Sequence, residues 1–329
     1  MRNINLKYAW NKIFGNLLST AGDIEGVCGR RITASIADML WCVFRYGAHP
    51  KDYFMFEFYR KSGWERNSYL TIMKYFRLVD MLNKALPLRH ELANKALQHK
   101  IYRDFIRRDW MLFDKDTSPK DIYEFLEKHL DGGIIKPVNG EQGHGIGKVR
   151  KNEKEKIDKF IEEARTSDFI IEELLVNTTE LAVLNPTSLN TIRVYTMVDR
   201  TGNVHILEMM LRVGNGDVGV DNWGSGGVGY HIDKESGVID QYGLDKKSGK
   251  YLRHPASGIM MLGFRIPRFQ ELLEFVNKLA NVEPRARFVG WDIAILPNRL
   301  ELVEMNCPGG HDFLQAFGNG YYRVIKSNW

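Results

Sequence analysis

The strongest pattern in the sequence is VGWDIAILPNRLELVEMNCPGG, residues 289–310, which predicts a β-hairpin. Apolar residues recur along Val289–Leu296, Pro297–Arg299 supplies the turn, and Leu300–Met305 returns with alternating Leu, Val and Met. We therefore expect two paired strands close to the end of the chain.

Three side chains of this hairpin are suited to binding a metal ion: Asp292, Glu304 and Asn306. Glu304 and Asn306 are two residues apart and so point to the same face of an extended strand. Asp292 lies across from them if the strands pair. Two carboxylates and an amide oxygen suit Mg²⁺, which takes hard oxygen ligands and keeps positions open for phosphate and water. The alternative is a solvated hairpin face that carries acidic residues by chance.

The composition is that of a soluble globular protein. The chain has 329 residues, of which 44% are hydrophobic and 26% charged, enough for two or three subdomains with their own cores. Three cysteines without metal-binding spacing fit reduced thiols. The N-terminus lacks the pattern of a secretory signal, and no apolar run is long enough to span a membrane. We expect a cytoplasmic protein.

The positive charge is concentrated in the first third of the chain. The net charge is +5, and residues 1–98 hold 15 Lys and Arg against 8 Asp and Glu. This excess could face an anionic substrate, an anionic lipid surface or nucleic acid, or be an ordinary solvated surface. Because no nucleic-acid-binding motif accompanies it, we expect no nucleic-acid partner.

Helical spacing of apolar residues predicts that residues 1–98 are mostly helical, with helices over 4–20, 32–46 and 69–83. Residues 22–29 read as a loop, and another helix is predicted over 101–108. The first helix is interpreted as packing on a core, with peripheral membrane contact as the alternative. We find no catalytic constellation in residues 1–98.

A glycine-rich hairpin follows. Strand Gly133–Val138 carries Lys136, the glycine-rich segment Asn139–Lys148 comes next, and Val149 begins another short strand. A lysine before a flexible glycine turn predicts a phosphate-binding loop, because backbone N–H groups approach the phosphates while the lysine neutralises them. The pattern is not a P-loop, since no Gly-Lys-Ser/Thr opens a helix.

Two further strands carry charged residues among apolar ones. Glu172 and Glu173 interrupt the strand Phe169–Val176, where paired acids are costly unless they border a ligand. Arg193 lies in the strand Ser188–Val198 and indicates either an anion in the site or a buried ion pair. The glycine-rich stretch 214–229 is either a mobile loop over a site or a plain surface connection.

In this order the motifs IIKPVNGEQGHGIGKV, IIEELL, NPTSLNTIRVYT, VDNWGSGGVG, WDIAI and VEMNCPGG resemble ATP-grasp enzymes, most closely the sugar-transfer-associated branch. The resemblance covers roughly residues 99–320. It implies an α+β ATP-grasp fold in which two α+β subdomains clasp ATP between them. The predicted division is a helical region over 1–98, a subdomain with the glycine-rich lid over 99–175, and a subdomain with the Mg²⁺ and substrate site over 176–329.

The resemblance also implies roles for single residues in binding ATP. The groups that would hold its phosphates are Lys100, Lys136, Gly140, Gly143 and Gly145. The residues that would border the adenine are Glu172, Glu173 and Leu175, and Glu180 would bind the ribose. The sequence has His99-Lys100 where Asp-Lys is common in the family.

For the chemistry, the resemblance implies Arg193 at the γ-phosphate and the acyl intermediate, with Lys136 as the second catalytic residue. Mg²⁺ would bind at Asp292, Glu304 and Asn306. The residues assigned to the second substrate are Arg212, Asn222, Gly226 and Gln315. His144 and His311 fall near the expected site, and we interpret both as loop residues.

The function implied is an ATP-dependent carboxylate–amine ligase that works through an acyl phosphate and releases ADP. The family association suggests a sugar acid and an amino acid or amine, in capsule, O-antigen or exopolysaccharide synthesis. The basic N-terminal third would then contact a membrane or polysaccharide-assembly enzymes. A kinase of a sugar or polyol hydroxyl is the alternative on the same fold. A non-enzymatic nucleotide-binding module is disfavoured, because the lysine, the arginine and all three metal ligands are present.

Overall fold

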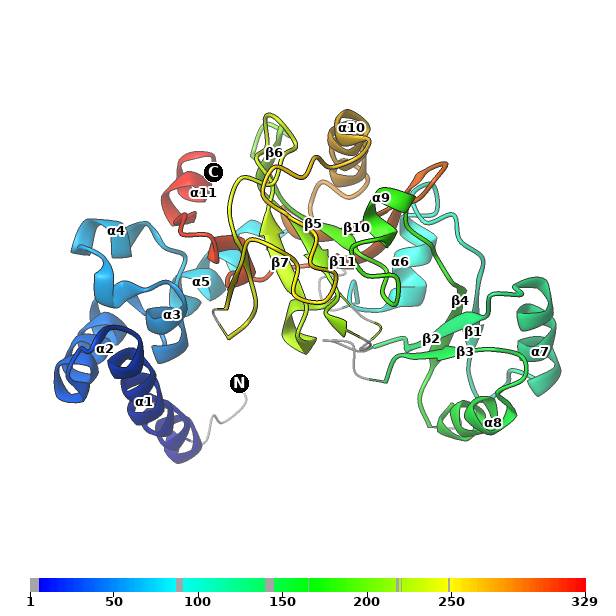
Figure 1. Ribbon diagram of the computed structural model, residues 1–329, viewed down its shortest axis with the longest axis horizontal. Helices are drawn as coiled ribbons and strands as arrows, with labels where there is room; N and C mark the ends of the chain where they lie inside the picture. Colours follow the sequence, from blue (N-terminus) through cyan, green and yellow to red (C-terminus); the bar gives the residue numbers. More distant parts are fainter. Residues whose placement is uncertain are drawn as a thin grey trace. The chain divides into compact units, whose positions relative to one another are not determined.

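The computed structural model describes residues 6–86, 91–139, 145–164, 166–216, 219, 221–247 and 249–329, with side chains from residue 17 onward. The chain divides into two compact units (Figure 1). The helical unit comprises Met1–Ala85 and Gly310–Trp329, and the sheet unit comprises Leu86–Gly309. The predicted boundaries at residues 98 and 175 stay a prediction.

The helical unit confirms the mostly helical N-terminal region. Its elements are α1 (Leu6–Cys28), α2 (Ile32–Tyr46), α3 (Pro50–Met55), η1 (Phe58–Arg60), α4 (Gly63–Ser68), α5 (Ile72–Leu82), η4 (Phe313–Gln315) and α11 (Tyr322–Ser327). The loop predicted at residues 22–29 is wrong, since α1 continues to Cys28. Burial of Ala21 and Ile24 in the core outweighs the cost of about 1 kcal/mol for a helical glycine. Gly47 ends α2 with φ +65°, a conformation that glycine adopts without strain.

The sheet unit contains a small antiparallel sheet in the order β1-β4-β2-β3. Its strands are β1 (Trp110–Phe113), β4 (Phe169–Glu173), β2 (Gly133–Pro137) and β3 (Gly147–Val149). Helices α7 (Pro119–Lys128) and α8 (Lys154–Glu163) pack on it, since Ile122 and Ile157 share a core with Ile135 and Ile171. Helix α7 begins at Pro119, and the side chain of Ser118 caps it. This sheet presents Lys136 and Glu172 on neighbouring strands.

The larger sheet of this unit has seven strands in the order β11-β10-β5-β6-β7-β8-β9. They are β5 (Thr191–Val198), β6 (Val204–Val213), β7 (Val228–His231), β8 (Gly243–Leu244), β9 (Lys250–Tyr251), β10 (Phe288–Ile295) and β11 (Leu300–Asn306). Around it lie α6 (Lys95–Ile101), α9 (Thr179–Ala182), η3 (Trp223–Ser225) and α10 (Phe269–Ala280), whose apolar face joins the core of the sheet.

The predicted hairpin is confirmed as β10 and β11. The two strands pair antiparallel, with Asp292 opposite Glu304 and Gly290 opposite Asn306. On its other side β10 pairs with β5, which places Asp292 opposite Arg193. The helix predicted over residues 101–108 is wrong, because the helix here is α6, which begins at Lys95 and ends at Ile101.

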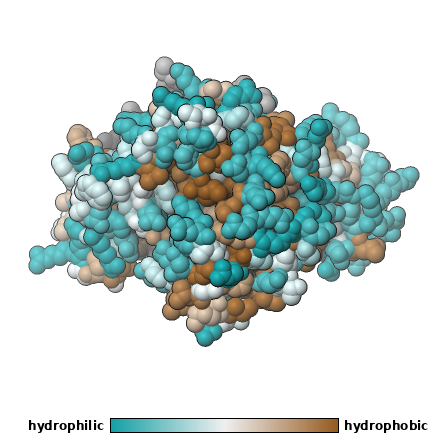
Figure 2. Space-filling model, turned by 90° about the horizontal axis from the view of Figure 1, so that it is seen from above, coloured by the Kyte–Doolittle hydropathy of each residue, from teal (hydrophilic) through white to brown (hydrophobic). Residues whose placement is uncertain are grey.

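The surface mixes polar and apolar residues. On the face shown in Figure 2, hydrophobic residues form patches among hydrophilic ones. Such patches are common on soluble proteins, so a binding surface needs further evidence. Among the helices of the described ranges, none combines the length and apolar character needed to cross a bilayer.

Candidate active site

Asp292 is the centre of a cluster of polar groups on the larger sheet. Its carboxylate is buried and accepts two hydrogen bonds from Arg193 on β5, from Nε at 2.5 Å and from Nη2 at 3.1 Å. Arg212 on β6 lies 3.1 Å from the same carboxylate. The amide of Asn306 donates a hydrogen bond to Oδ2 at 3.3 Å. Three strands thus supply two guanidinium groups and an amide to one aspartate.

The charges explain the titration of this cluster. Burial opposes ionisation of Asp292, but the positive charges of Arg193 and Arg212 outweigh it and lower the pKa of the carboxyl. Asp221 lies 3.5 Å from Arg212 and accepts hydrogen bonds from Thr191. Burial raises the pKa of Asp221, and the negative charge of Asp292 adds to that rise. Asp292 is therefore ionised more readily than Asp221.

Helix α6 connects the hairpin to the small sheet. The Nζ of Lys95 lies 3.2 Å from Oε1 of Glu304, the residue paired with Asp292. One turn later, the side-chain amide of Gln98 donates to the Met305 carbonyl and accepts from its N–H, both at 2.9 Å. His99, next to Gln98, lies 2.7 Å from Glu172 on β4. Side chains at i, i+3 and i+4 share one face of a helix, so α6 ties β11 to β4.

Glu172 is the acceptor for three groups in the interior. Its side chain is 2% exposed and meets Lys136 at 2.6 Å, His99 at 2.7 Å and Arg108 at 2.9 Å. Burial opposes the charged form, but Arg108 and Lys136 overcome it and hold the pKa of Glu172 well below its usual value. Arg108 also donates to the carbonyls of Leu302 and Val303 on β11. The lysine predicted to bind phosphate is thus held by a network that reaches β11, the strand with two of the predicted metal ligands.

A second branch of ion pairs runs outward from Glu173. Its carboxylate lies 3.5 Å from Arg299 and 3.4 Å from His129, and His129 lies 3.3 Å from Asp109. Ligand atoms of Asp109, His129 and Glu173 all lie within 4.8 Å of one another. Lys128 and Arg299 already pair with the two carboxylates, so the cluster is neutralised within the protein. Glu173 is engaged here by its side chain, and its backbone N–H donates a hydrogen bond to the Asp109 carbonyl at 3.0 Å.

The other residues predicted to bind ATP are only partly accounted for. Lys100 is exposed on the last turn of α6, whereas Lys95 on the same helix forms the ion pair with Glu304. Gly140 and Gly143, like His144, lie outside the described residues. Gly145 is described with φ +74°, and a Cβ there would lie 2.9 Å from Pro137, so this position requires glycine. Leu175 is half-buried just after β4.

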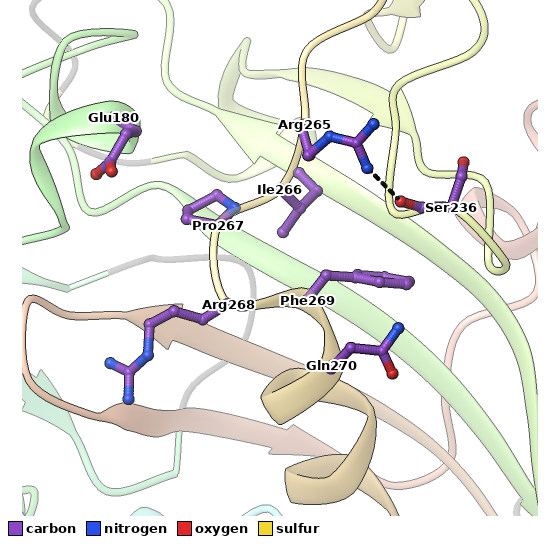
Figure 3. A pocket seen from close by; sticks show the side chains of 8 residues that line it. All are labelled: Glu180, Ser236, Arg265, Ile266, Pro267, Arg268, Phe269 and Gln270. Carbon is purple, nitrogen blue, oxygen red and sulfur yellow. Dashed lines mark hydrogen bonds between the residues drawn. The ribbon is translucent and has the colours of Figure 1, made fainter.

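Glu180 lies on α9 at the edge of a cavity of about 420 Å³ (Figure 3). The wall opposite is made by the segment Arg265–Gln270. Figure 3 shows the guanidinium of Arg265 turned toward the Ser236 carbonyl, to which it donates a hydrogen bond of 3.2 Å. Arg268 donates to Glu271 and to the Leu296 carbonyl. The two arginines are therefore engaged by the protein, while Glu180 is exposed.

Of the residues assigned to the second substrate, only Arg212 contacts the Asp292 cluster among the described contacts. The side chain of Asn222 caps η3, and Gly226 ends it with φ +99°. Gln315 belongs to the helical unit, where it exchanges hydrogen bonds with the backbone of Leu70. His311 belongs to the same unit and lies 3.0 Å from Asp52. A role for Asn222, Gly226 and Gln315 in substrate binding stays a prediction.

Sequence reasoning missed the residues that hold the site together, above all Lys95, Gln98, His99 and Arg108. The partners described above are 64 to 209 positions away in the chain. The one local signal is the Lys-x-x-Gln-His spacing, which places three polar side chains on one face of a short helix. Asn94 caps that helix by accepting from the Leu97 N–H, and it marks the start that the prediction placed too late.

The predicted metal ligands fit Mg²⁺ by their chemistry. Asp292 and Glu304 offer carboxylate oxygens from directly paired positions, and Asn306 offers an amide oxygen two residues further along β11. The Glu304 side chain is 35% exposed, so an incoming ion can reach it. A bound ion would share Asp292 with two arginines and Glu304 with Lys95, and these cations also suit the phosphates of a nucleotide.

The small sheet carries Lys136, and the larger sheet carries the paired acidic residues Asp292 and Glu304. The fold is that of the ATP-grasp class. A family model described as sugar-transfer associated ATP-grasp matches residues 90–324. The chain therefore belongs to the sugar-transfer-associated ATP-grasp family, as the sequence motifs indicated. No curated protein matched the sequence significantly.

Several solved structures are similar at low identity. N5-carboxyaminoimidazole ribonucleotide synthetase in its ADP complex is 11% identical with a TM-score of 0.43, over 67% of this chain and 45% of that one. D-alanyl-alanine synthetase A from Vibrio cholerae is 12% identical with a TM-score of 0.44, over 72% and 60%. VanG D-Ala:D-Ser ligase from Enterococcus faecalis is 17% identical with a TM-score of 0.44, over 73% and 61%. The chain spans less than two thirds of each of these proteins, and the family assignment comes from the family model.

Proposed function

We propose that the protein is an ATP-dependent carboxylate–amine ligase that forms ADP and phosphate through an acyl phosphate. The observation that carries the proposal is the arrangement at the hairpin. Asp292 and Glu304 lie opposite each other on paired strands. Arg193 and Arg212 form ion pairs with Asp292, and Lys95 forms one with Glu304. Phosphoryl transfer depends on positioning and on neutralising charge more than on covalent help from the protein. This cluster supplies both.

Lys95 and Lys136 are the candidates to hold the ATP phosphates. Each is largely buried and each is fixed by a carboxylate, Lys95 by Glu304 and Lys136 by Glu172. We assign Lys95 the phosphate role that the sequence suggested for Lys100, because Lys95 reaches the metal ligands. The backbone around Glu173 and Leu175 would read the adenine edge, and Glu180 would bind the ribose.

The reaction follows from what these groups can do. A substrate carboxylate oxygen attacks the γ-phosphorus, and ADP leaves. The amine then attacks the acyl carbon, phosphate leaves, and the amine loses a proton. Arg193 and Arg212 stabilise the negative charge on the acyl phosphate and on the oxyanion formed by the amine. Mg²⁺ held by Asp292, Glu304 and Asn306 would neutralise charge on the ATP phosphates. A glycine-rich segment over 139–147 closing on ATP would exclude water from the acyl phosphate.

The substrates are proposed from the family description alone. Its association with sugar transfer supports a sugar acid as the carboxylate and an amino acid or other amine as the nucleophile, in polysaccharide assembly in the cytoplasm. A kinase acting on a sugar hydroxyl would use the same lysines and metal ligands. The two proposals differ in the product, since only the ligase requires an amine.

The test is ADP release from Mg²⁺-ATP with a panel of uronic acids and nucleotide-linked uronic acids, each with and without mixed amino acids, followed by mass spectrometry. ADP that requires both partners, with an amide product, supports the ligase. Hydroxylamine added in place of the amine should yield a hydroxamate. A phosphorylated sugar formed without an amine would establish the kinase instead. ATP binding without ADP release across the panel would refute the proposed substrate class. Arg285→Gln, an exposed arginine paired with Glu283, serves as the control variant.

A further inference from the structure

Helix α2 carries apolar residues on two opposite sides. On one side Met39, Cys42 and Tyr46 belong to the core of the helical unit. On the other side Trp41 and Phe44 are 56% and 92% exposed. Surface helices ordinarily present polar residues to water, and a helix that is apolar all round is covered on all sides. The described part of the chain leaves this second side of α2 uncovered.

The exposed apolar residues of α2 form a continuous stripe. Ala37, Leu40, Trp41 and Phe44 are spaced i, i+3, i+4 and i+7, which places them on one face over two turns. We call these four residues the α2 stripe. Three of them are large, so the stripe offers substantial apolar area to a partner.

More exposed apolar residues adjoin the end of α2. The N–H of Met73, at the start of α5, donates to the Gly47 carbonyl just after α2 at 3.2 Å. Met73 and Phe76 are both more than half exposed. Among the described residues, the Trp and Phe side chains classed as exposed all belong to the helical unit: Trp41, Phe44, Trp64 and Phe76.

The exposed charges at the two ends of α2 are positive. Asp38, the acidic residue of α2, is held inside the unit by Arg66 at 2.7 Å, Tyr53 at 2.7 Å and Arg30 at 3.1 Å. Arg31 and Arg45 are exposed at the two ends of α2. The first 98 residues hold 15 basic against 8 acidic residues. An apolar stripe with an arginine at each end complements a surface that has an apolar interior beneath an anionic outer layer.

We propose that the α2 stripe lies flat in the interface of an anionic membrane, with Arg31 and Arg45 against lipid phosphates. Tryptophan, phenylalanine and arginine on one exposed face are typical of helices that lie in an interface. A second copy of the chain fits less well. Pairing α2 antiparallel with its copy sets Arg31 against Arg45, and pairing it parallel sets each arginine against itself.

The test is co-sedimentation of the full chain with vesicles of phosphatidylcholine, alone or mixed with phosphatidylglycerol. We expect binding to the mixed vesicles, weakened by high salt because charge contributes to it. Trp41→Ser combined with Phe44→Ser should reduce partitioning by about tenfold or more. Arg45→Gln should reduce it by about fivefold. The matched control is Leu130→Ser, which alters a residue 91% exposed in the sheet unit and should leave binding unchanged.

Several outcomes would overturn the proposal. Failure of the wild-type chain to bind anionic vesicles would do so, as would equal losses in the double variant and the Leu130→Ser control. Self-association in solution that the double variant abolishes, without vesicle binding by the wild type, would make the stripe an interface between copies. Unchanged circular dichroism and melting of each variant establish that it is folded. ATP-dependent turnover plays no part in this assay, so the result is independent of the proposed reaction.

Discussion

Replacing Glu172 by Gln tests the interior network most directly. The substitution keeps the shape of the side chain but removes the negative charge that Lys136 and Arg108 share. Removing one partner of a buried ion pair costs about 3–5 kcal/mol, because it leaves a buried charge uncompensated. Arg108 keeps Glu301 at 3.4 Å, so we take the lower end, about 3 kcal/mol. For a unit of this size that corresponds to a melting temperature roughly 6–12 °C lower.

The pH dependence gives a second readout with a defined sign. The folded-state pKa of Glu172 lies well below its value of 4.5 in the unfolded chain. Its charge therefore contributes stability above about pH 4.5, and that contribution is lost as the pH falls through the folded-state pKa. At pH 7 the free energy of unfolding of the wild type should exceed that of Glu172→Gln by about 3 kcal/mol. This difference in free energy should become smaller below pH 4.5.

Calorimetric melting at pH 7 and at acid pH measures both effects. Glu127→Gln is the matched control, since Glu127 pairs with Lys151 at 2.5 Å but is 56% exposed. Exposed pairs contribute from about 0 to 1 kcal/mol, so this control should melt close to the wild type. If Glu172→Gln melts with the control at pH 7, the network does not stabilise the sheet unit and the reasoning is refuted. A stability difference that persists unchanged at acid pH would show that charge is not its cause.

Four other predictions concern the site. Glu304→Ala should abolish turnover while leaving the ligand-free melting temperature nearly unchanged, and a large loss of stability would instead make Glu304 structural. Lys95→Met should weaken ATP binding in calorimetry by about tenfold, whereas Lys100→Met on the same helix should not. Arg212→Gln should slow hydroxamate formation by about 100-fold with little effect on ATP affinity, and an unchanged rate would remove Arg212 from the chemistry. Mg²⁺ should bind measurably only together with ATP, and binding of the free ion would contradict the charge balance of the Asp292 cluster.

The hairpin was predictable because its signals are local. Alternating apolar residues and a Pro-Asn turn define β10 and β11, and strand pairing then brings Asp292 opposite Glu304. The same holds for α7, whose cap at Ser118 lies next to the helix it begins. Where a stretch of sequence contains both the apolar repeat of an element and the residues that begin or end it, the element can be recognised from that stretch alone.

The network behind the site was not predictable in this way. Lys95 meets Glu304, and Gln98 meets Met305, across some two hundred positions of the chain. No periodicity encodes such a pairing, because it depends on where the tertiary fold brings α6. The error at Gly22 has the same origin, since local propensity favours a break there and packing of Ala21 and Ile24 overrides it.

For Arg193 the structure shows one of the two interpretations, and the other stays a prediction. The sequence left open whether it faces an anion or forms a buried ion pair, and the structure contains the ion pair with Asp292. The partner is a predicted metal ligand, however, and Arg212 and Lys95 bring further positive charge to the same two carboxylates. These three cations face three carboxylates, because Asp221 also pairs with Arg212. A divalent cation alone would therefore add uncompensated positive charge to the cluster, whereas phosphate groups bound with it would offset that charge. We therefore expect Asp292 and Glu304 to hold a metal ion only together with the nucleotide, whose phosphates would also pair with Arg193.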